Sequence, residues 1–134
     1  MKKLLVLIAL FLPMALHPSD KGVVSSYKVY DGDTLTNVTI DVGWDLQLAN
    51  QKIRIFGIDT PELRTKNPIE KKQAEQATQV LKDLLSVSKE TTVILVKKDS
   101  FGRLLCHLIV KTDKGDIDVA EYMLSTGMAV KFKK

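Results

Sequence analysis

Apolar and polar residues in the first half of the chain alternate with the two-residue period of β-strands. Residues 22–30 carry valine, tyrosine and serine, and residues 34–42 alternate and are rich in β-branched side chains. Residues 47–56 end in clean alternation, with Ile53 and Ile55 on one face and Lys52, Arg54 and Phe56 on the other. Such patterns are typical of strands that have one buried face. We therefore expect three strands here, of which the first two pair.

The period changes to that of a helix over residues 70–87. The apolar side chains at helical spacing are Ala74, Ala77, Leu81 and Leu84. Lysine and glutamine occupy most of the opposite face, which predicts an amphipathic helix. Residues 91–96 and 104–110 then have the composition of two further strands.

A second, short helix is expected at residues 119–126. Asp118 is the predicted N-cap, Glu121 its capping-box partner and Gly127 the terminator. Three strands, a helix, two strands and a terminal helix indicate a mainly β fold with helices (α+β). The order is compatible with a five-stranded barrel of the OB type, with the long helix between strands three and four. We find no repeat and no second linker, so residues 20–134 are expected to form one domain.

The first 19 residues have the composition of a secretory signal peptide. Two lysines precede an apolar run over residues 4–16, and polar residues follow. The run of 13 residues is shorter than the roughly 20 that a membrane-spanning helix needs. We expect the leader to be cleaved and the protein to be secreted, either outside the cell or into a periplasm; an uncleaved membrane anchor is the alternative. The leader has no nearby cysteine, which argues against a lipid-anchored lipoprotein.

Charge and cysteine content restrict the functional classes only weakly. Loss of Lys2 and Lys3 with the leader lowers the formal net charge from +4 to about +2, because all 16 acidic residues remain. Nucleic-acid binding must then depend on where particular arginines lie. Cys106 is the only cysteine, which excludes an intrachain disulfide and a thiolate zinc cluster, and we expect a buried strand thiol. Trp44 is expected to be a packing or loop residue rather than a platform for base stacking.

The segment VYDGDTL places two aspartates on either side of a glycine. Asp31-Gly32 alone is a strong signal for a tight hairpin turn, because the dipeptide suits backbone positions with positive φ. The turn does not require a second carboxylate, however, and Asp33 would present one rigidly at the start of the second strand. Both interpretations of this segment, a tight turn and half of a metal site, remain open.

A second acidic segment, IDTPE, follows the third strand. Pro61 favours an extended conformation at Thr60, so Asp59 and Glu62 leave the strand on a stiff connection. Two carboxylates held close together would repel each other unless a hard divalent cation lay between them, and Asp33 could complete such a cluster. The other interpretation is a solvated turn.

Two arginines complete the candidate chemistry. Arg54 projects from the third strand on the face opposite the isoleucines at 53 and 55, and therefore lies outside the core. Arg103 follows Gly102 in the turn-like stretch DSFGR. Taken alone, an arginine after a hairpin is usually only solvated.

Together these segments resemble the thermonuclease family, whose members have a staphylococcal nuclease-like domain. The resemblance rests on the order DGDT, an arginine five residues before DTPE, a helix, and an aromatic-Gly-Arg turn, and it extends from residue 23 to about residue 131. It implies an OB-fold barrel that hydrolyses phosphodiester bonds of DNA and RNA with one Ca²⁺ and leaves 3′-phosphate ends. A monomer is assumed.

The resemblance also implies a role for each matching residue. Asp33 and Asp59 would be the calcium carboxylates, the backbone carbonyl of Thr60 would add a ligand, and Asp31 would support them. Glu62 would position or deprotonate the attacking water. Arg54 and Arg103 would hold the scissile phosphate, which suits arginine because its planar fork can bind two phosphate oxygens at once.

One position departs from the family, and one other function fits the same fold. Phe101 stands where many members have tyrosine, so stacking on a base or sugar is retained while a hydroxyl contact is lost. The alternative function is a non-catalytic OB module that binds nucleic acid or a protein partner. Such a module has little chemical reason to keep together the full set of Asp33, Arg54, Asp59, Glu62 and Arg103. The presence of this full set of residues favours the enzyme.

Overall fold

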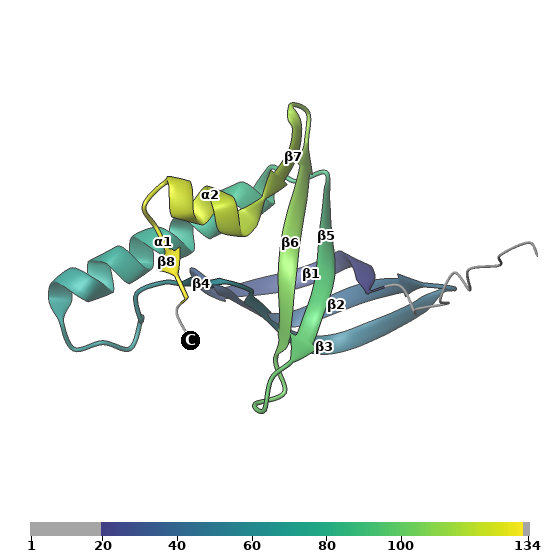
Figure 1. The fold of residues 1–134 in the computed structure, drawn as a ribbon, viewed down its shortest axis with the longest axis horizontal. Coiled ribbons are helices and arrows are strands. Elements are labelled where there is room, and N and C mark those ends of the chain that lie inside the picture. The colour runs from purple at the N-terminus through teal and green to yellow at the C-terminus, as the bar shows by residue number, and fades with distance from the viewer. Residues whose placement is uncertain (1–19, 133–134) are drawn as a thin grey trace, which may run out of the picture.

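Five long strands curl into a closed barrel in a computed structural model that describes residues 20–132 (Figure 1). The strands are β1 (Lys21–Asp31), β2 (Thr34–Gly43), β3 (Leu46–Ile55), β5 (Glu90–Lys98) and β6 (Leu104–Thr112). Their order is β3-β2-β1-β5-β6, and a parallel pairing between β3 and β6 closes the ring. The predicted five-stranded OB-type barrel is confirmed.

Three short strands were not predicted from the sequence. They are β4 (Ile58–Asp59), β7 (Gly115–Asp118) and β8 (Val130–Lys131). β7 extends the sheet beside β6, whereas β4 and β8 pair with each other in an antiparallel sheet of two strands. The β4–β8 pairing brings the C-terminal segment next to the IDTPE segment.

The long helix α1 (Pro68–Ser86) begins two residues before the predicted start. The side chain of Asn67 caps it by accepting hydrogen bonds from the backbone N–H groups of Ile69 and Glu70, and Pro68 occupies the first helical position. A capping asparagine and a proline at the first helical position are both common at the N-terminus of a helix. No helix within residues 20–132 is long and apolar enough to cross a membrane. The predicted leader, residues 1–19, lies outside the described residues.

The short helix α2 (Val119–Ser125) matches its prediction closely. The carboxylate of Asp118 accepts a hydrogen bond from the backbone N–H of Glu121 at 3.2 Å, which confirms Asp118 as the N-cap. Gly127 follows the helix with φ of 75°, as expected for a residue that ends a helix.

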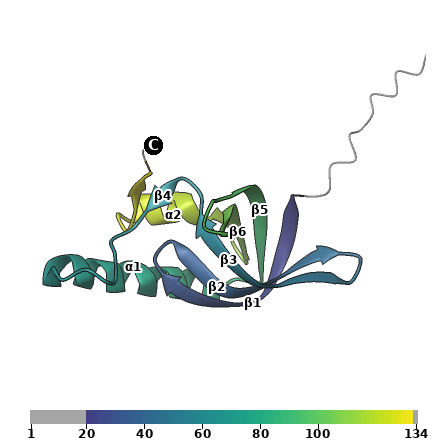
Figure 2. The same ribbon diagram turned by 90° about the horizontal axis from the view of Figure 1, so that it is seen from below.

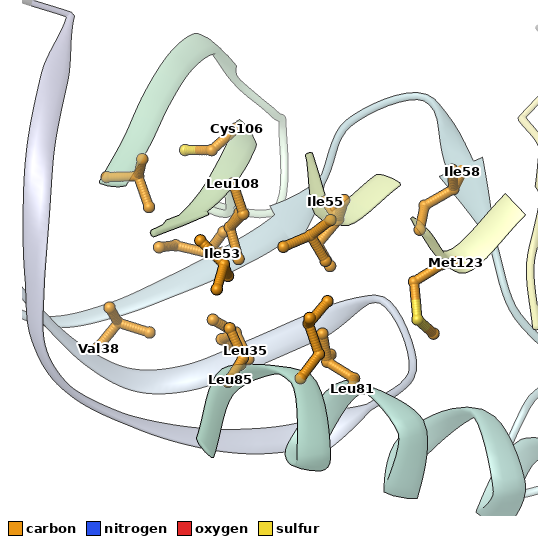
Figure 3. Close-up of a cluster of buried hydrophobic side chains, with 14 of the residues drawn as sticks. Leu35, Val38, Ile53, Ile55, Ile58, Leu81, Leu85, Cys106, Leu108 and Met123 are labelled. Carbon is orange, nitrogen blue, oxygen red and sulfur yellow. The ribbon is translucent and has the colours of Figure 1, made fainter. Parts of the chain in front are cut away.

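The hydrophobic core fills the barrel and continues onto α1 (Figure 3). Leu81 and Leu85 of the helix are directed toward the barrel, where Leu35 and Ile53 are fully buried. Cys106 is buried in the same cluster, and burial raises the pKa of its thiol to about 11. The expected buried strand thiol is therefore confirmed, and the thiol is protonated at neutral pH.

The β1–β2 turn packs tightly against α1 and the IDTPE segment. Asp31 pairs with Thr34 across a two-residue turn, so the predicted hairpin is confirmed. Its predicted reason is wrong, because Gly32 is not among the described residues with positive φ. A Cβ at Gly32 would instead lie 2.8 Å from the Cβ of Ala77 and 3.1 Å from the Cβ of Thr60. Glycine is needed there because three segments meet without room for a side chain.

Replacing Gly32 with alanine should lower the free energy of unfolding by about 1–3 kcal/mol, the usual cost of overpacking. Urea unfolding measures the change. Ala77→Gly removes the methyl group that clashes and by itself costs about 1 kcal/mol of helix propensity. The two substitutions together should therefore cost less than their sum. A Gly32→Ala protein as stable as the wild type would contradict this packing.

Candidate functional site

Asp33 is a buried carboxylate that connects two segments far apart in the sequence. Its side chain lies in the β1–β2 turn, and the residue is 5% exposed. Oδ2 accepts a hydrogen bond from the backbone N–H of Thr60 at 3.0 Å, and Oδ1 accepts one from the hydroxyl of Thr34 at 2.9 Å. The carboxylate is therefore held rigidly beside the start of the IDTPE segment, as a ligand-binding group requires.

The guanidinium of Arg54 lies between Asp33 and Asp59. β2 and β3 pair Thr34 with Arg54, which brings the arginine next to the turn. Its Nη1 is 3.1 Å from Oδ2 of Asp33, and its Nη2 is 3.2 Å from Oδ1 of Asp59. The side chain of Arg54 is 12% exposed, so these pairs are screened by water less than surface pairs are. The sequence placed Arg54 outside the core but did not indicate that it pairs with both carboxylates.

The oxygen atoms around Arg54 fit a hard divalent cation. Carboxylates of Asp33 and Asp59 already converge on one positive charge, and carboxylate and carbonyl oxygens are the ligands that Ca²⁺ prefers. Within residues 20–132, no group of three or more His, Cys, Asp or Glu side chains is close enough to hold a metal. A cation here therefore needs backbone oxygen and water in addition to the two carboxylates. The buried hydroxyl of Thr60 has no hydrogen-bond partner, which leaves one polar atom unsatisfied next to this cluster.

Asp31, the last residue of β1, is hydrogen-bonded to the backbone of Asp33. Its Oδ1 accepts a hydrogen bond from the backbone N–H of Asp33 at 3.1 Å. Burial and the neighbouring Asp33 carboxylate raise the pKa of Asp31 to about 6. The structure thus places Asp31 where it can support Asp33 through the backbone.

Glu62 shares a cleft with Asp59. It is exposed, and the cleft of about 520 Å³ is lined by Asp59 and Thr60 as well. Among residues 20–132, Asp33, Asp59 and Glu62 do not form a group of three carboxylates that could hold a metal by themselves. The predicted contribution of Glu62 to the site stays a prediction. Pro61, which precedes Glu62 in the IDTPE segment, lines the same cleft. Gln73 and Gln76 of α1 form part of the opposite wall; the sequence indicated only a polar helix face there.

Arg103 is held by a neighbour that the sequence analysis missed. Its Nε is 2.7 Å from Oδ2 of Asp99, and Oδ1 of Asp99 accepts hydrogen bonds from the backbone N–H groups of Phe101 and Arg103. Burial alone would raise the pKa of Asp99, but these hydrogen bonds and the charge of Arg103 hold it below its usual value. An aspartate that begins a glycine-containing turn often accepts such bonds, so DSFGR did contain the signal.

Strand register places Arg103 and Arg54 on the same outer face of the barrel. β3 and β6 run parallel and pair Arg54 with Leu105. Arg103 stands two residues before Leu105, and alternation therefore directs it to the same side, while Cys106 and Leu108 point into the core. Phe101 is 82% exposed, and its ring centre lies 5.8 Å from Cζ of Arg103. An exposed aromatic ring and two arginines thus occupy neighbouring positions.

Comparison with known proteins identifies the family. Residues 52–134, more than half of the chain, match the family model described as staphylococcal nuclease homologue. This chain belongs to the staphylococcal nuclease homologue family. The part of this chain that matches the family model contains six of the candidate residues: Arg54, Asp59, Thr60, Glu62, Phe101 and Arg103. Membership points to a hydrolase of the nuclease kind at family level.

A curated relative gives a more distant comparison. An uncharacterised lipoprotein of Mycoplasma genitalium is 32% identical over 91 residues, which are 62% of this chain and 33% of the relative. The chain therefore spans about a third of the length of that relative.

Arg54→Met should lower the free energy of unfolding, measured with urea in the presence of EGTA, by about 3 kcal/mol or more, because a buried carboxylate loses its partner. Arg103→Met is the matched control. It should cost at most about 1 kcal/mol, because the side chain of Arg103 is 34% exposed. Equal losses in the two variants would contradict the structural role of Arg54.

Asp31 should make the stability of the metal-free protein depend on pH. Between 3.8 and about 6 the folded protein keeps a proton that the unfolded chain has released. Stability therefore falls as the pH rises through this window and then levels off. The loss should be about 1 kcal/mol, because the partly exposed side chain is screened by water. Asp31→Asn should remove this component of urea unfolding curves; an unchanged pH dependence would contradict the raised pKa.

Proposed function

We propose that the protein is a secreted, Ca²⁺-dependent nuclease that hydrolyses phosphodiester bonds of DNA and RNA and leaves 3′-phosphate ends. The observation that carries the proposal is the convergence of Asp33 and Asp59 on the guanidinium of Arg54. A paired set of carboxylates beside a phosphate-binding side chain is what metal-assisted phosphodiester hydrolysis needs. Family membership supplies the general class of reaction.

In this proposal Asp33, Asp59 and the backbone carbonyl of Thr60 hold one calcium ion. When bound, the ion supplies positive charge that neutralises the phosphodiester and the charge that develops in the transition state. Extracellular calcium sites typically bind at about 10⁻⁴ to 10⁻³ M, which two carboxylates with carbonyl and water ligands can achieve.

Arg54 and Arg103 bind the scissile phosphate. A cation held by Asp33 and Asp59 would share the carboxylate partners of Arg54, which would weaken its two ion pairs and leave its planar fork available for phosphate oxygens. Arg103 approaches from the neighbouring strand, oriented by Asp99. Phe101 stacks on a base or sugar beside them, which fixes the strand without reading its sequence.

Glu62 accepts the proton of the attacking water. The water oxygen forms a bond to phosphorus while the bond from phosphorus to the 5′ oxygen breaks, and the departing oxygen takes up a proton from the solvent to become a hydroxyl. The 3′ side keeps the phosphate. An exposed glutamate on the rim of a cleft shared with Asp59 and Thr60 has access to both water and substrate.

Export by the N-terminal leader completes the proposal. The composition of residues 1–19 supports it, and millimolar calcium outside the cell suits the proposed site. The Mycoplasma relative is named a lipoprotein, which agrees with a location at or beyond the membrane. A chain anchored by an uncleaved leader is the alternative form of the same enzyme.

The decisive experiment measures cleavage of single-stranded DNA by residues 20–134 with millimolar Ca²⁺ and then with EGTA. Cleavage should require calcium and should collapse in Glu62→Gln. Glu75→Gln, the same change on the exposed face of α1, should leave it intact. A folded protein that binds the DNA without cutting it would replace the nuclease with the non-catalytic binding module.

Arg54→Lys and Arg103→Lys should each remove roughly 3 kcal/mol of transition-state stabilisation, a rate loss of about a hundredfold or more. Lysine keeps the charge but cannot hold two phosphate oxygens with a planar fork. Steady-state cleavage rates measure the loss, and Arg64→Lys, at an exposed position, serves as the control. Turnover like that of the wild type in either variant would end the assignment of that arginine.

A further inference from the structure

The tip of the β2–β3 hairpin exposes three large apolar side chains. Trp44 is 96% exposed, and Leu46 and Leu48 beside it are 63% and 45% exposed. We call these three residues the hairpin tip. Trp44 was expected to be a packing or loop residue. It is a loop residue, and it does not pack in the core. The hairpin extends away from the body of the barrel (Figure 2), so the core does not explain why the tip is apolar.

The backbone at the tip makes tryptophan an unexpected residue there. Trp44 and Asp45 have φ of 59° and 57°, the left-handed region in which turns favour asparagine, aspartate and glycine. A bulky side chain is disfavoured in this conformation. The turn is nevertheless well formed, because the carboxylate of Asp41 accepts a hydrogen bond from the N–H of Gly43 at 2.9 Å. A residue that opposes the local backbone preference and adds nothing to the core points to a function outside the fold.

The start of the described chain lies on the same side of the molecule as the hairpin tip (Figures 1 and 2). β1 pairs with β2 as far as Val23 and Asp41, and its first residues pair with β5, where the carbonyl of Asp20 accepts a hydrogen bond from the N–H of Leu95 at 2.8 Å. Both views show the start of β1 and the end of the β2–β3 hairpin on one side of the molecule (Figures 1 and 2). Asp20, the first described residue, is where the predicted leader would join this side of the domain.

The charges around the tip argue against a polyanionic partner. Asp20, Asp41 and Asp45 lie at this end and outnumber Lys21. Nucleic acid and strongly anionic lipid headgroups would be repelled rather than attracted. Tryptophan flanked by leucine is instead typical of residues that sit at the boundary between lipid headgroups and hydrocarbon.

We propose that, in the chain that retains its leader, the hairpin tip inserts into the headgroup region of a zwitterionic bilayer. The leader tethers the domain, and Trp44 with its two leucines fixes how the domain faces the membrane. β2 has Asp33 just before its first residue and Trp44 just after its last. At about 3.3 Å per residue, this ten-residue strand holds the candidate active site up to roughly 30 Å from the tip. The site is thereby held away from the lipid, in solution, where the nucleic acid of the proposed function, on which this inference rests, would reach it.

Trp44 is the only tryptophan, so its fluorescence tests the proposal directly. The full chain, residues 1–134, is bound to phosphatidylcholine vesicles whose acyl chains carry bromine. We expect the vesicles to quench Trp44, to shift its emission to shorter wavelength and to protect it from iodide in the water. Adding phosphatidylglycerol should not strengthen these effects.

Two sets of variants serve as controls. Leu46→Ser with Leu48→Ser should weaken the quenching, whereas Ile69→Ser, at a still more exposed position on α1, should not. A tryptophan moved to the other hairpin, in Trp44→Phe with Phe101→Trp, should remain open to iodide and unquenched by bromine.

Four results would overturn the proposal. Flotation with vesicles tests the tethering by the leader separately from the insertion of the hairpin tip. A chain that does not float with vesicles lacks the tether. A chain that floats while Trp44 stays open to iodide has a tip that does not reach the lipid. Equal quenching at positions 44 and 101 would show contact without orientation. An emission shift that grows with protein concentration in the absence of lipid would mean that the tip packs against a second copy.

Discussion

The ion pairs of Arg54 with Asp33 and Asp59 hold the candidate site together. They join the β1–β2 turn, strand β3 and strand β4, which the chain order alone would not bring into contact. Two carboxylates facing each other without a cation would repel, and Asp33 is too buried for water to screen that repulsion fully. The close packing of Gly32 against Ala77 and Thr60 then fixes the turn in the position that these pairs require.

Both phosphate-binding candidates are already bound to carboxylates within the protein. Arg54 is held by two aspartates and Arg103 by Asp99. A phosphate bound by these arginines, as proposed, would have to compete with the aspartates for the guanidinium groups. A cation that takes over the charges of Asp33 and Asp59 would free Arg54 but not Arg103, whose partner lies in the other hairpin. The two arginines are thus expected to respond differently to calcium.

Much of the fold could be predicted from period and turn chemistry, but contacts between distant segments could not. The five long strands and both helices follow from alternation and helical spacing, and Asn67-Pro68 offered a local signal for the start of α1 that was overlooked. The two-residue strands β4 and β8 have no pattern of their own because only their pairing defines them. For the same reason the sequence could nominate Asp33, Arg54 and Asp59 but could not show that Arg54 joins the two aspartates, or that Glu62 lines a cleft with Asp59.

The most direct test of this account is a calcium titration of residues 20–134 followed by the backbone amide signals in two-dimensional NMR spectra. The amide of Thr60 donates to Asp33, and the amide of Asp33 donates to Asp31, so both report on the proposed ligands. We predict that these two signals shift and saturate together at millimolar Ca²⁺, and that Asp33→Asn abolishes the change. Signals that stay in place while the protein remains folded would contradict a calcium site at Asp33 and Asp59.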